Sequence, residues 1–226
     1  MVALANLHPV GDKEELDSYM YQSVGHSVIN QIADCYGLPL YRRGISGSPV
    51  NLGLDYQPTV GDEVEDLYQL LKTVLQHHPE ISGVSSGAIR SVYQKNRVEE
   101  VCARLGLVSL AYLWERDQVE LLDSMIGAGV EAVLIKTAAH GLGAKHLGKS
   151  IKELRDELVV LSSRLGLNPC GEGGEYETLT LNSPLYVKGY LTLLPDSELI
   201  NLSRDVCIMK PRVLFHPKVQ VTTVVE

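Results

Sequence analysis

The chain has 226 residues, of which 45% are hydrophobic and 21% charged, a composition typical of a globular protein with one large domain or two small ones. Its net charge of -8 argues against a general nucleic-acid-binding protein, since such proteins usually present a basic surface. The four cysteines have no Cys-x-x-Cys spacing, which argues against a structural zinc site and favours reduced thiols in a cytoplasmic protein. No run approaches the ~20 apolar residues of a membrane span.

Strand and helix patterns alternate along most of the chain. In chain order we expect a strand over 2–7, a helix over 13–36, a strand over 38–42, a loop over 44–60, a helix over 62–76, a strand and turn over 83–89, a helix from about 91 to 105, a strand over 110–114, a helix over 117–126, a strand over 131–136 and a helix over 150–165. Strands and turns follow residue 166. This order predicts an α/β fold with a mostly parallel sheet flanked by helices and a strand-rich C-terminal lobe.

Helix starts are the sharpest local signals. Ser91 and Ser150 are each followed three residues later by Gln or Glu, which is capping-box spacing, and Asp117 is a candidate cap for the helix after it. Gly87, Ala88 and Ile89 precede the first of these helices, whose early residues include basic side chains. Small residues before a helix start can admit an anion to free N–H groups. Taken alone, the pattern also fits an ordinary strand-to-helix turn.

The segment 170–178, Cys-Gly-Glu-Gly-Gly-Glu-Tyr-Glu-Thr, is the most informative in the chain. Three carboxylates crowded beside flexible glycines repel each other unless a cation or a donor meets them. The alternative is a glycine turn that enters a strand with its acids facing water. Trp114, the only tryptophan, is either a core anchor or a face that stacks on a base or a substrate cation. His140 and His146 could bind a metal, but no third ligand has suitable spacing.

Taken together, six ordered segments resemble one family. They are Leu16-Asp17-Ser18-Tyr19-Met20-Tyr21-Gln22, Gly61-Asp62-Glu63-Val64-Glu65-Asp66-Leu67, Gly87-Ala88-Ile89 with Tyr93-Gln94 and Arg97-Val98-Glu99, Leu110-Ala111-Tyr112-Leu113-Trp114, His146-Leu147-Gly148-Lys149, and 170–178. Their order and spacing, over residues 1 to about 190, are similar to diphthine–ammonia ligase (diphthamide synthetase) of the N-type ATP pyrophosphatases. The resemblance implies a Rossmann-like, adenine nucleotide alpha hydrolase-like fold.

The resemblance also implies an activity. The family uses ATP, with Mg²⁺, to adenylate the carboxylate of diphthine, a modified histidine of translation elongation factor two, and ammonia then displaces AMP to give diphthamide. Diphthine also carries a trimethylammonium group, for which carboxylates and aromatic rings are suitable partners. The implied partners are therefore the diphthine-bearing factor, ATP and ammonia, in the cytoplasm, with neither a membrane nor a nucleic acid.

The implied site has two parts. Nucleotide contacts are expected from Gly87, Ala88 and Ile89, with Arg97 as a phosphate partner. Substrate contacts are expected from Glu172, Gly173, Gly174, Glu175, Tyr176 and Glu177. No general base or metal ligand is named.

The sequence departs from the family in three places. The phosphate-binding signature Ser-Gly-Gly-x-Asp-Ser does not occur, and Met1 aligns with the family's second strand. We therefore expect a truncated ligase that turns over ATP poorly. Val92 stands where the family suggests an acid, and the tail does not resemble the family's ending. The expected division is an incomplete nucleotide-binding lobe (1–110), a substrate-recognition lobe (111–194) and a divergent, poorly packed tail (195–226).

Two other functions stay open. The first is a non-catalytic module that binds the elongation factor or regulates a full-length ligase. The second is another pyrophosphatase-type enzyme that acts on a different carbonyl, such as a tRNA base. The acidic net charge argues against the second, because RNA binding usually needs a basic surface.

Overall fold

The computed structural model describes residues 1–11, 13–16, 18–203 and 206–218, and within them it confirms the α/β class. The helices are α1 (Ile29–Tyr36), α2 (Glu63–His77), α3 (Val92–Leu105), α4 (Gln118–Gly127) and α5 (Ile151–Leu165), with 3-10 turns η1 (His26–Val28) and η2 (Ala144–His146). The strands are β1 (Leu4–His8), β2 (Leu40–Gly44), β3 (Gly83–Ser85), β4 (Val108–Leu110), β5 (Glu131–Thr137), β6 (Tyr176–Asn182), β7 (Gly189–Leu193), β8 (Glu198–Asn201), β9 (Cys207–Lys210) and β10 (Val213–Pro217).

Strand direction divides the chain in two. In the first half β1 pairs in parallel with β2, and β3 in parallel with β4, as two separate pairs within the described residues. In the second half the pairing is antiparallel, in the order β6-β5-β9-β8, with β7 and β10 as a further pair. The parallel pairs and the strand-rich C-terminal part agree with the expected fold.

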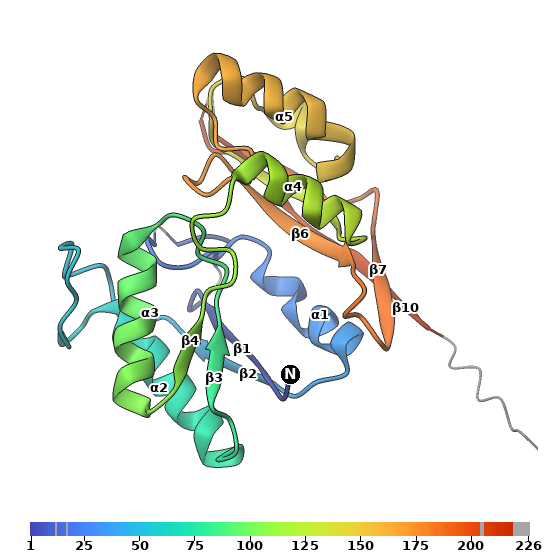
Figure 1. The fold of residues 1–226 in the computed structure, drawn as a ribbon. Coiled ribbons are helices and arrows are strands. Elements are labelled where there is room, and N and C mark those ends of the chain that lie inside the picture. Colours follow the sequence, from blue (N-terminus) through green and yellow to red (C-terminus); the bar gives the residue numbers. More distant parts are fainter. Residues whose placement is uncertain (12, 17, 204–205, 219–226) are drawn as a thin grey trace, which may run out of the picture.

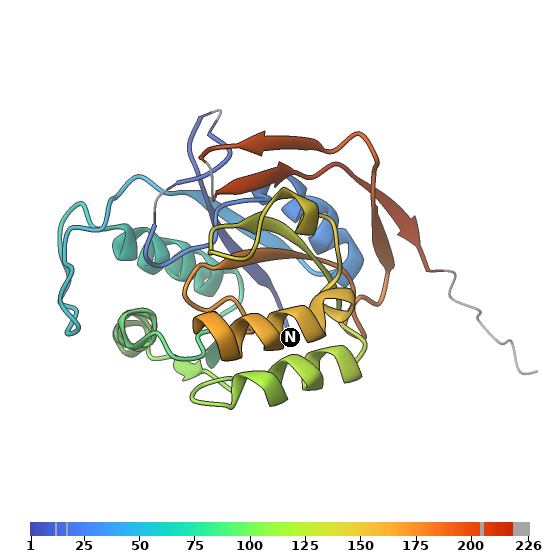
Figure 2. The ribbon, with the colours of Figure 1, turned by 90° about the horizontal axis from the view of Figure 1, so that it is seen from above.

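Helices cover both kinds of sheet (Figures 1 and 2). Helix α2 packs on β1 and β2, while α3 packs on β4 and on α2. Helices α4 and α5 lie side by side over one face of the antiparallel sheet. The central strand β5 is buried on both faces, because Ala132 and Leu134 pack in the cluster under α4 and α5 and Val133 and Ile135 in the cluster that includes Val28. A strand with two covered faces carries a nearly continuous apolar run, here residues 132–135.

The capping signals in the sequence are confirmed. Ser91 accepts from Gln94 N, Asp117 accepts from the N–H groups of the first turn of α4, and Ser150 forms a reciprocal capping box with Glu153. Each cap satisfies an N–H group that has no partner inside its helix. These three helices therefore begin where their local sequence indicates.

The predicted helix over 13–36 is wrong in its first half. Regular helix begins only at Ile29, after η1, and the described residues of 13–24 form an irregular strap of bends and a turn. Ser23 Oγ accepts from Leu16 N, and Ser18 Oγ accepts from Met20 N. These local bonds offer the backbone an alternative to helical pairing. Gly25 then adopts a left-handed conformation (φ 79°) ahead of η1.

The expectation of a poorly packed tail is also wrong for its described part. Strand β9 pairs with both β5 and β8, and Cys207, Ile208 and Met209 are buried in the core. The reason is that β5 offers β9 a free edge opposite β6, which no local pattern in the tail announces. Residues 219–226, the end of the predicted tail, lie outside the described residues.

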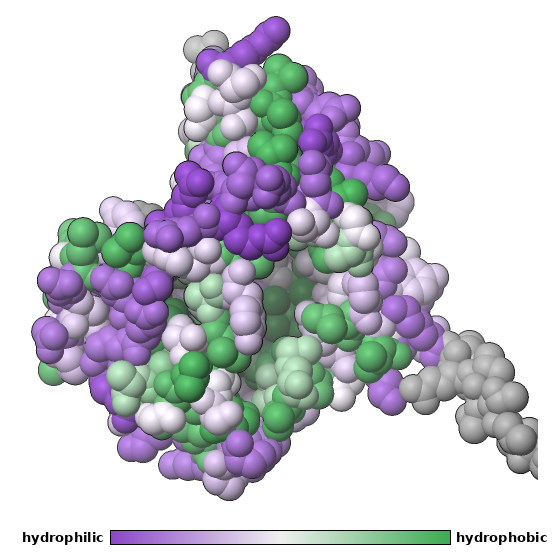
Figure 3. All heavy atoms as spheres, viewed as in Figure 1, coloured by the Kyte–Doolittle hydropathy of each residue, from purple (hydrophilic) through white to green (hydrophobic). Residues whose placement is uncertain are grey.

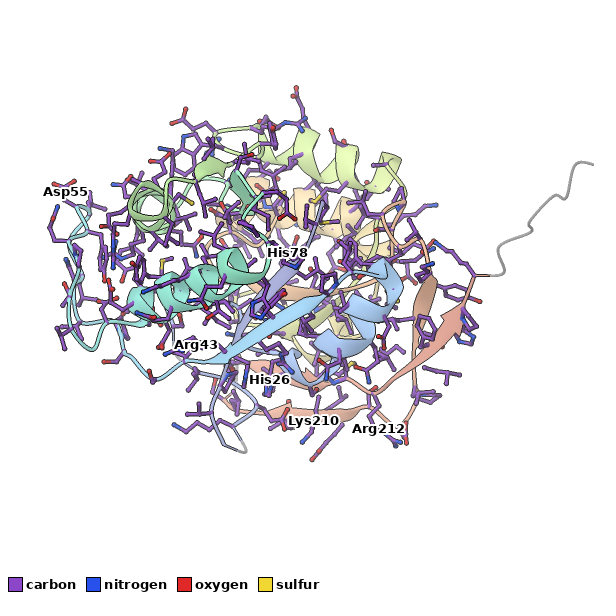
Figure 4. The ribbon with its side chains drawn as sticks, turned by 90° about the horizontal axis from the view of Figure 1, so that it is seen from below. His26, Arg43, Asp55, His78, Lys210 and Arg212 are labelled. Carbon is purple, nitrogen blue, oxygen red and sulfur yellow. The ribbon has the colours of Figure 1, made fainter. Side chains whose placement is uncertain are left out.

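Ion pairs hold the strap to the C-terminal sheet. Lys210 pairs with Glu14 and Lys136 with Glu15, and His26 and Lys210 lie on the same side of the molecule (Figure 4). Figure 3 shows a hollow near the centre of the face drawn in Figure 1, with hydrophobic residues at its floor. No helix in the described part of the chain is long and apolar enough to cross a membrane.

Candidate functional site

The turn after β3 and the loop before β6 meet through one carboxylate. Glu172 Oε1 accepts hydrogen bonds from the backbone N–H groups of Ile89 (2.9 Å), Arg90 (2.7 Å) and Ser91 (3.0 Å), 81 to 83 residues away in sequence. These amides stand at the start of α3, the end nearest the beginning of β6 in Figure 1. The carboxylate thus neutralises the positive end of the helix. The two segments that the sequence singled out are therefore joined in the fold, while the ligands they contact stay a prediction.

Two amides of this turn have no such partner. The N–H groups of Gly87 and Ala88 donate to no acceptor in the part of the chain that the structure describes. A Cβ atom added at Gly87 would meet nothing within 4 Å, so an anionic group could approach the backbone there. The side chains of Ala88 and Ile89 are buried and fix the turn. The two free N–H groups are the donors that a nucleotide contact at this turn would need, and that contact stays a prediction.

The glycine loop is held in a tight internal conformation. Glu175 Oε1 accepts from Asn168 N (3.0 Å) and its Oε2 accepts from Gly173 N (2.8 Å). Gly171 has φ 72°, and a Cβ there would lie 2.7 Å from the carbonyl oxygen of Tyr176. Only glycine fits that combination of angle and space. Gly174, also at positive φ, meets nothing within 4 Å.

The aromatic ring of the loop is part of the core. Tyr176 is 4% exposed and packs in the cluster under α4 and α5. Its hydroxyl donates to the carbonyl of Pro169 (2.5 Å), and burial raises its pKa. In this structure the ring therefore anchors the loop and does not line an open cavity.

The third carboxylate faces a lysine. Glu177 Oε1 lies 2.9 Å from Lys136 Nζ, which also pairs with Glu15. Burial raises the pKa of Glu177, although Lys136 partly offsets the effect. Burial disfavours the charged form of Lys136, but both carboxylates outweigh it, so its pKa is raised. All three carboxylates of 172–177 thus have protein donors, and their contact with a substrate cation stays a prediction.

Arg97 lies away from the free amides. Its side chain is 0% exposed and donates to the carbonyls of Asn51, Gly53 (3.0 Å) and Tyr93 (3.1 Å). The guanidinium also stacks on the Tyr93 ring, 3.2 Å from its centroid. Arg97 therefore holds two carbonyls of the loop over 49–61, whose outer end carries Asp55 (Figure 4). Its expected phosphate contact stays a prediction.

A shallow cleft borders the same turn. Arg90, Val92, Trp114 and Glu115 line a cavity of about 300 Å³. Glu115 N donates to the carbonyl of Ile89 (2.7 Å), and Glu115 is the non-glycine residue with positive φ, 58°, in the described chain. Such a conformation is uncommon for a side-chain-bearing residue. Sequence reasoning did not choose Arg90 and Glu115, because only the tertiary turn brings them together.

The histidines carry no metal geometry. His146 is fully buried, with Nδ1 accepting from Gly143 N (2.9 Å) and Nε2 3.1 Å from Glu157 Oε1. It therefore closes the turn of η2. Among the described residues no three His, Cys, Asp or Glu side chains are grouped as metal ligands.

Comparison with known proteins gives the same family in both halves. The diphthamide synthase N-terminal domain matches residues 7–109, and the diphthamide synthase C-terminal domain matches residues 117–198. Proteins named diphthine–ammonia ligase are similar to the chain: from Danio rerio, 58% identical over 83% of this chain and 74% of that protein; from Homo sapiens, 49% identical over 91% and 77%; and from Schizosaccharomyces pombe, 53% identical over 96% and 36%. The chain thus spans about a third of the yeast relative's length. These matches show that the chain belongs to the diphthine–ammonia ligase family.

Proposed function

We propose that this chain takes part in diphthamide synthesis as an ATP-dependent ligase of the diphthine carboxylate. The observation that carries the proposal is the set of three hydrogen bonds from the start of α3 to Glu172. They join a segment of the N-terminal domain match to a segment of the C-terminal one. The proposed protein substrate is the diphthine-bearing elongation factor, and we place the activity in the cytoplasm.

Each part of the site has a proposed task. A carboxylate oxygen of diphthine attacks the α-phosphorus of ATP and displaces pyrophosphate, which gives an acyl adenylate. Ammonia then attacks the acyl carbon and displaces AMP to give the amide. The free N–H groups of Gly87 and Ala88 would donate to a phosphoryl oxygen, which is the use that such turns have in many α/β proteins. Glu172 holds the start of α3 in place by accepting from the backbone amides of Ile89, Arg90 and Ser91. Preorganised donors of this kind stabilise charge that develops during the reaction.

One observation favours a different function. Glu172 already accepts from the amides of Ile89, Arg90 and Ser91, the position where a helix start would receive an anionic ligand. A non-catalytic module that binds the elongation factor would need no nucleotide there.

Two measurements on the 226-residue chain separate these functions. Calorimetric titration with ATP and Mg²⁺ tests nucleotide binding, and release of AMP with the diphthine-bearing factor and ammonia tests turnover. The ligase proposal expects both. Factor binding without nucleotide binding would overturn it and support the module. Gly87→Val, which places a side chain over the free amides, should weaken ATP binding without loss of factor binding.

A further inference from the structure

The cleft beside the turn carries an aromatic face, a cation and an anion. Trp114 supplies the face, and Arg90 and Glu115 supply one charge of each sign. Val92, 42% exposed, adds an apolar surface. The backbone N–H of Arg90 is one of the amides that Glu172 accepts from, so the cleft and the carboxylate share one turn. A ligand in this cleft would therefore lie next to the candidate site.

The tryptophan face already meets a cation. Lys95 Nζ lies 5.3 Å from the centroid of the Trp114 ring, within the range of a cation–π contact. Lys95 itself is paired with Glu99 (2.8 Å) and stays partly exposed. The ring is thus placed to receive positive charge, and the group that contacts it is the end of a flexible side chain that can move aside.

A quaternary ammonium is the cation that such a cleft suits. It has no N–H group to donate, so it gains little from carboxylates that are already bonded to amides, as Glu172 and Glu175 are. It gains more from an aromatic face, apolar contact and an unbonded carboxylate nearby. Trp114, Val92 and Glu115 provide these three, while Arg90 offers a guanidinium to a carboxylate on the same ligand.

We propose that the Trp114–Glu115 cleft binds the trimethylammonium group of the substrate side chain, with Arg90 facing its carboxylate. This inference rests on the proposed function, whose substrate carries both groups. The cation subsite then lies beside the glutamate-rich loop and not within it. Glu115 and Trp114 become residues that determine specificity for the quaternary ammonium.

The single tryptophan makes the subsite directly measurable. Fluorescence of Trp114 can be followed during titration with glycine betaine, which has a trimethylammonium and a carboxylate. The matched control probe is 3,3-dimethylbutanoate, which replaces the charged nitrogen by carbon and keeps the shape. We expect saturable quenching by glycine betaine with an affinity about tenfold higher than that of the analogue without the positive charge. Equal affinities would overturn the proposal.

Two variants remove one charged group each, and we expect them to change betaine binding in opposite directions. Glu115→Gln should weaken glycine betaine binding about fivefold to tenfold. Lys95→Met removes the cation that competes for the ring, so it should strengthen binding. If Lys95→Met instead weakens binding of the betaine, the cleft is a site for an anion or a nucleotide base and the proposal fails. The comparison of glycine betaine with 3,3-dimethylbutanoate uses the unmodified chain, so it tests the proposal even if a variant fails to fold.

The same assay separates this inference from the proposed function. Quenching that is selective for glycine betaine, without AMP release, would support the subsite and refute the proposed ligase activity. If Trp114→Leu still releases AMP and its KM for the diphthine-bearing factor is unchanged, the ligase proposal stands and the subsite proposal is refuted. A rise in KM at Trp114→Leu that Trp114→Phe largely restores would support an aromatic contact with the substrate.

Discussion

Replacing Glu172 is the sharpest test of how the site is built. In Glu172→Ala three N–H groups at the start of α3 lose their shared acceptor. A hydrogen bond to a charged group contributes about 1.5–3 kcal/mol. Because one oxygen serves all three amides, the contributions do not add, and we expect a loss of about 2–3 kcal/mol. In Glu172→Gln the acceptor oxygen remains and the charge at the helix start is lost, which costs about 1 kcal/mol or less.

Amide hydrogen exchange reads this loss at the three residues themselves. A local loss of about 2–3 kcal/mol corresponds to roughly 30- to 150-fold less protection at Ile89, Arg90 and Ser91. Glu198→Ala, the same substitution at an exposed carboxylate on β8, is the matched control and should leave the protection of these amides unchanged. Protection in Glu172→Ala that equals that of the unmodified chain would refute the bridge between the two segments.

Three further changes probe what supports the site. Arg97→Lys should lower the free energy of unfolding in urea by about 2–4 kcal/mol, since lysine lacks the fork that serves two loop carbonyls and one carbonyl of α3; an unchanged midpoint would contradict this role. Arg104 lowers the pKa of Glu65 below its ordinary value of 4.5, so their ion pair stabilises the fold above that pH and is lost as pH falls through the lowered pKa. Stability of Glu65→Gln should therefore fall below that of the unmodified chain at pH 7 and converge with it in acid, and a pH-independent difference would exclude the pair as the cause. Gly171→Ala should cost about 2 kcal/mol, or roughly 4–8 °C in Tm, whereas Gly87→Ala, with open space at its Cβ, should not; equal melting temperatures for the two variants would refute the steric argument.

Much of the fold could be predicted because the deciding contacts are local. Ser91, Asp117 and Ser150 each cap a helix whose first turn lies within three residues, and such bonds need no tertiary partner. The apolar run of β5 likewise announces a strand that is covered on both faces. The same reasoning failed for the strap over 13–24. Its apolar residues have helical spacing, but Ser18 and Ser23 accept hydrogen bonds from the local backbone instead.

The site was only half visible in the sequence. Clustered acids beside glycines indicated that 170–178 carries function, but not which donor each acid meets. Glu172 meets amides more than 80 residues away, Glu175 closes its own loop, and Glu177 faces Lys136. Arg97 lies close in sequence to the helix start, yet its side chain is fully buried. Sequence spacing along a helix cannot tell which side the core will cover.

The sequence by itself determined the family, the α/β class and the helix starts, since these depend on motif order, on apolar periodicity and on bonds that span a few residues. Tertiary structure alone decided that β9 enters the antiparallel sheet beside β5, that Glu172 caps the start of α3, and that Arg90, Trp114 and Glu115 share a cleft. The physical reason is that these contacts join segments far apart in the chain. Their partners are selected by packing of the whole fold, which no short stretch of residues encodes.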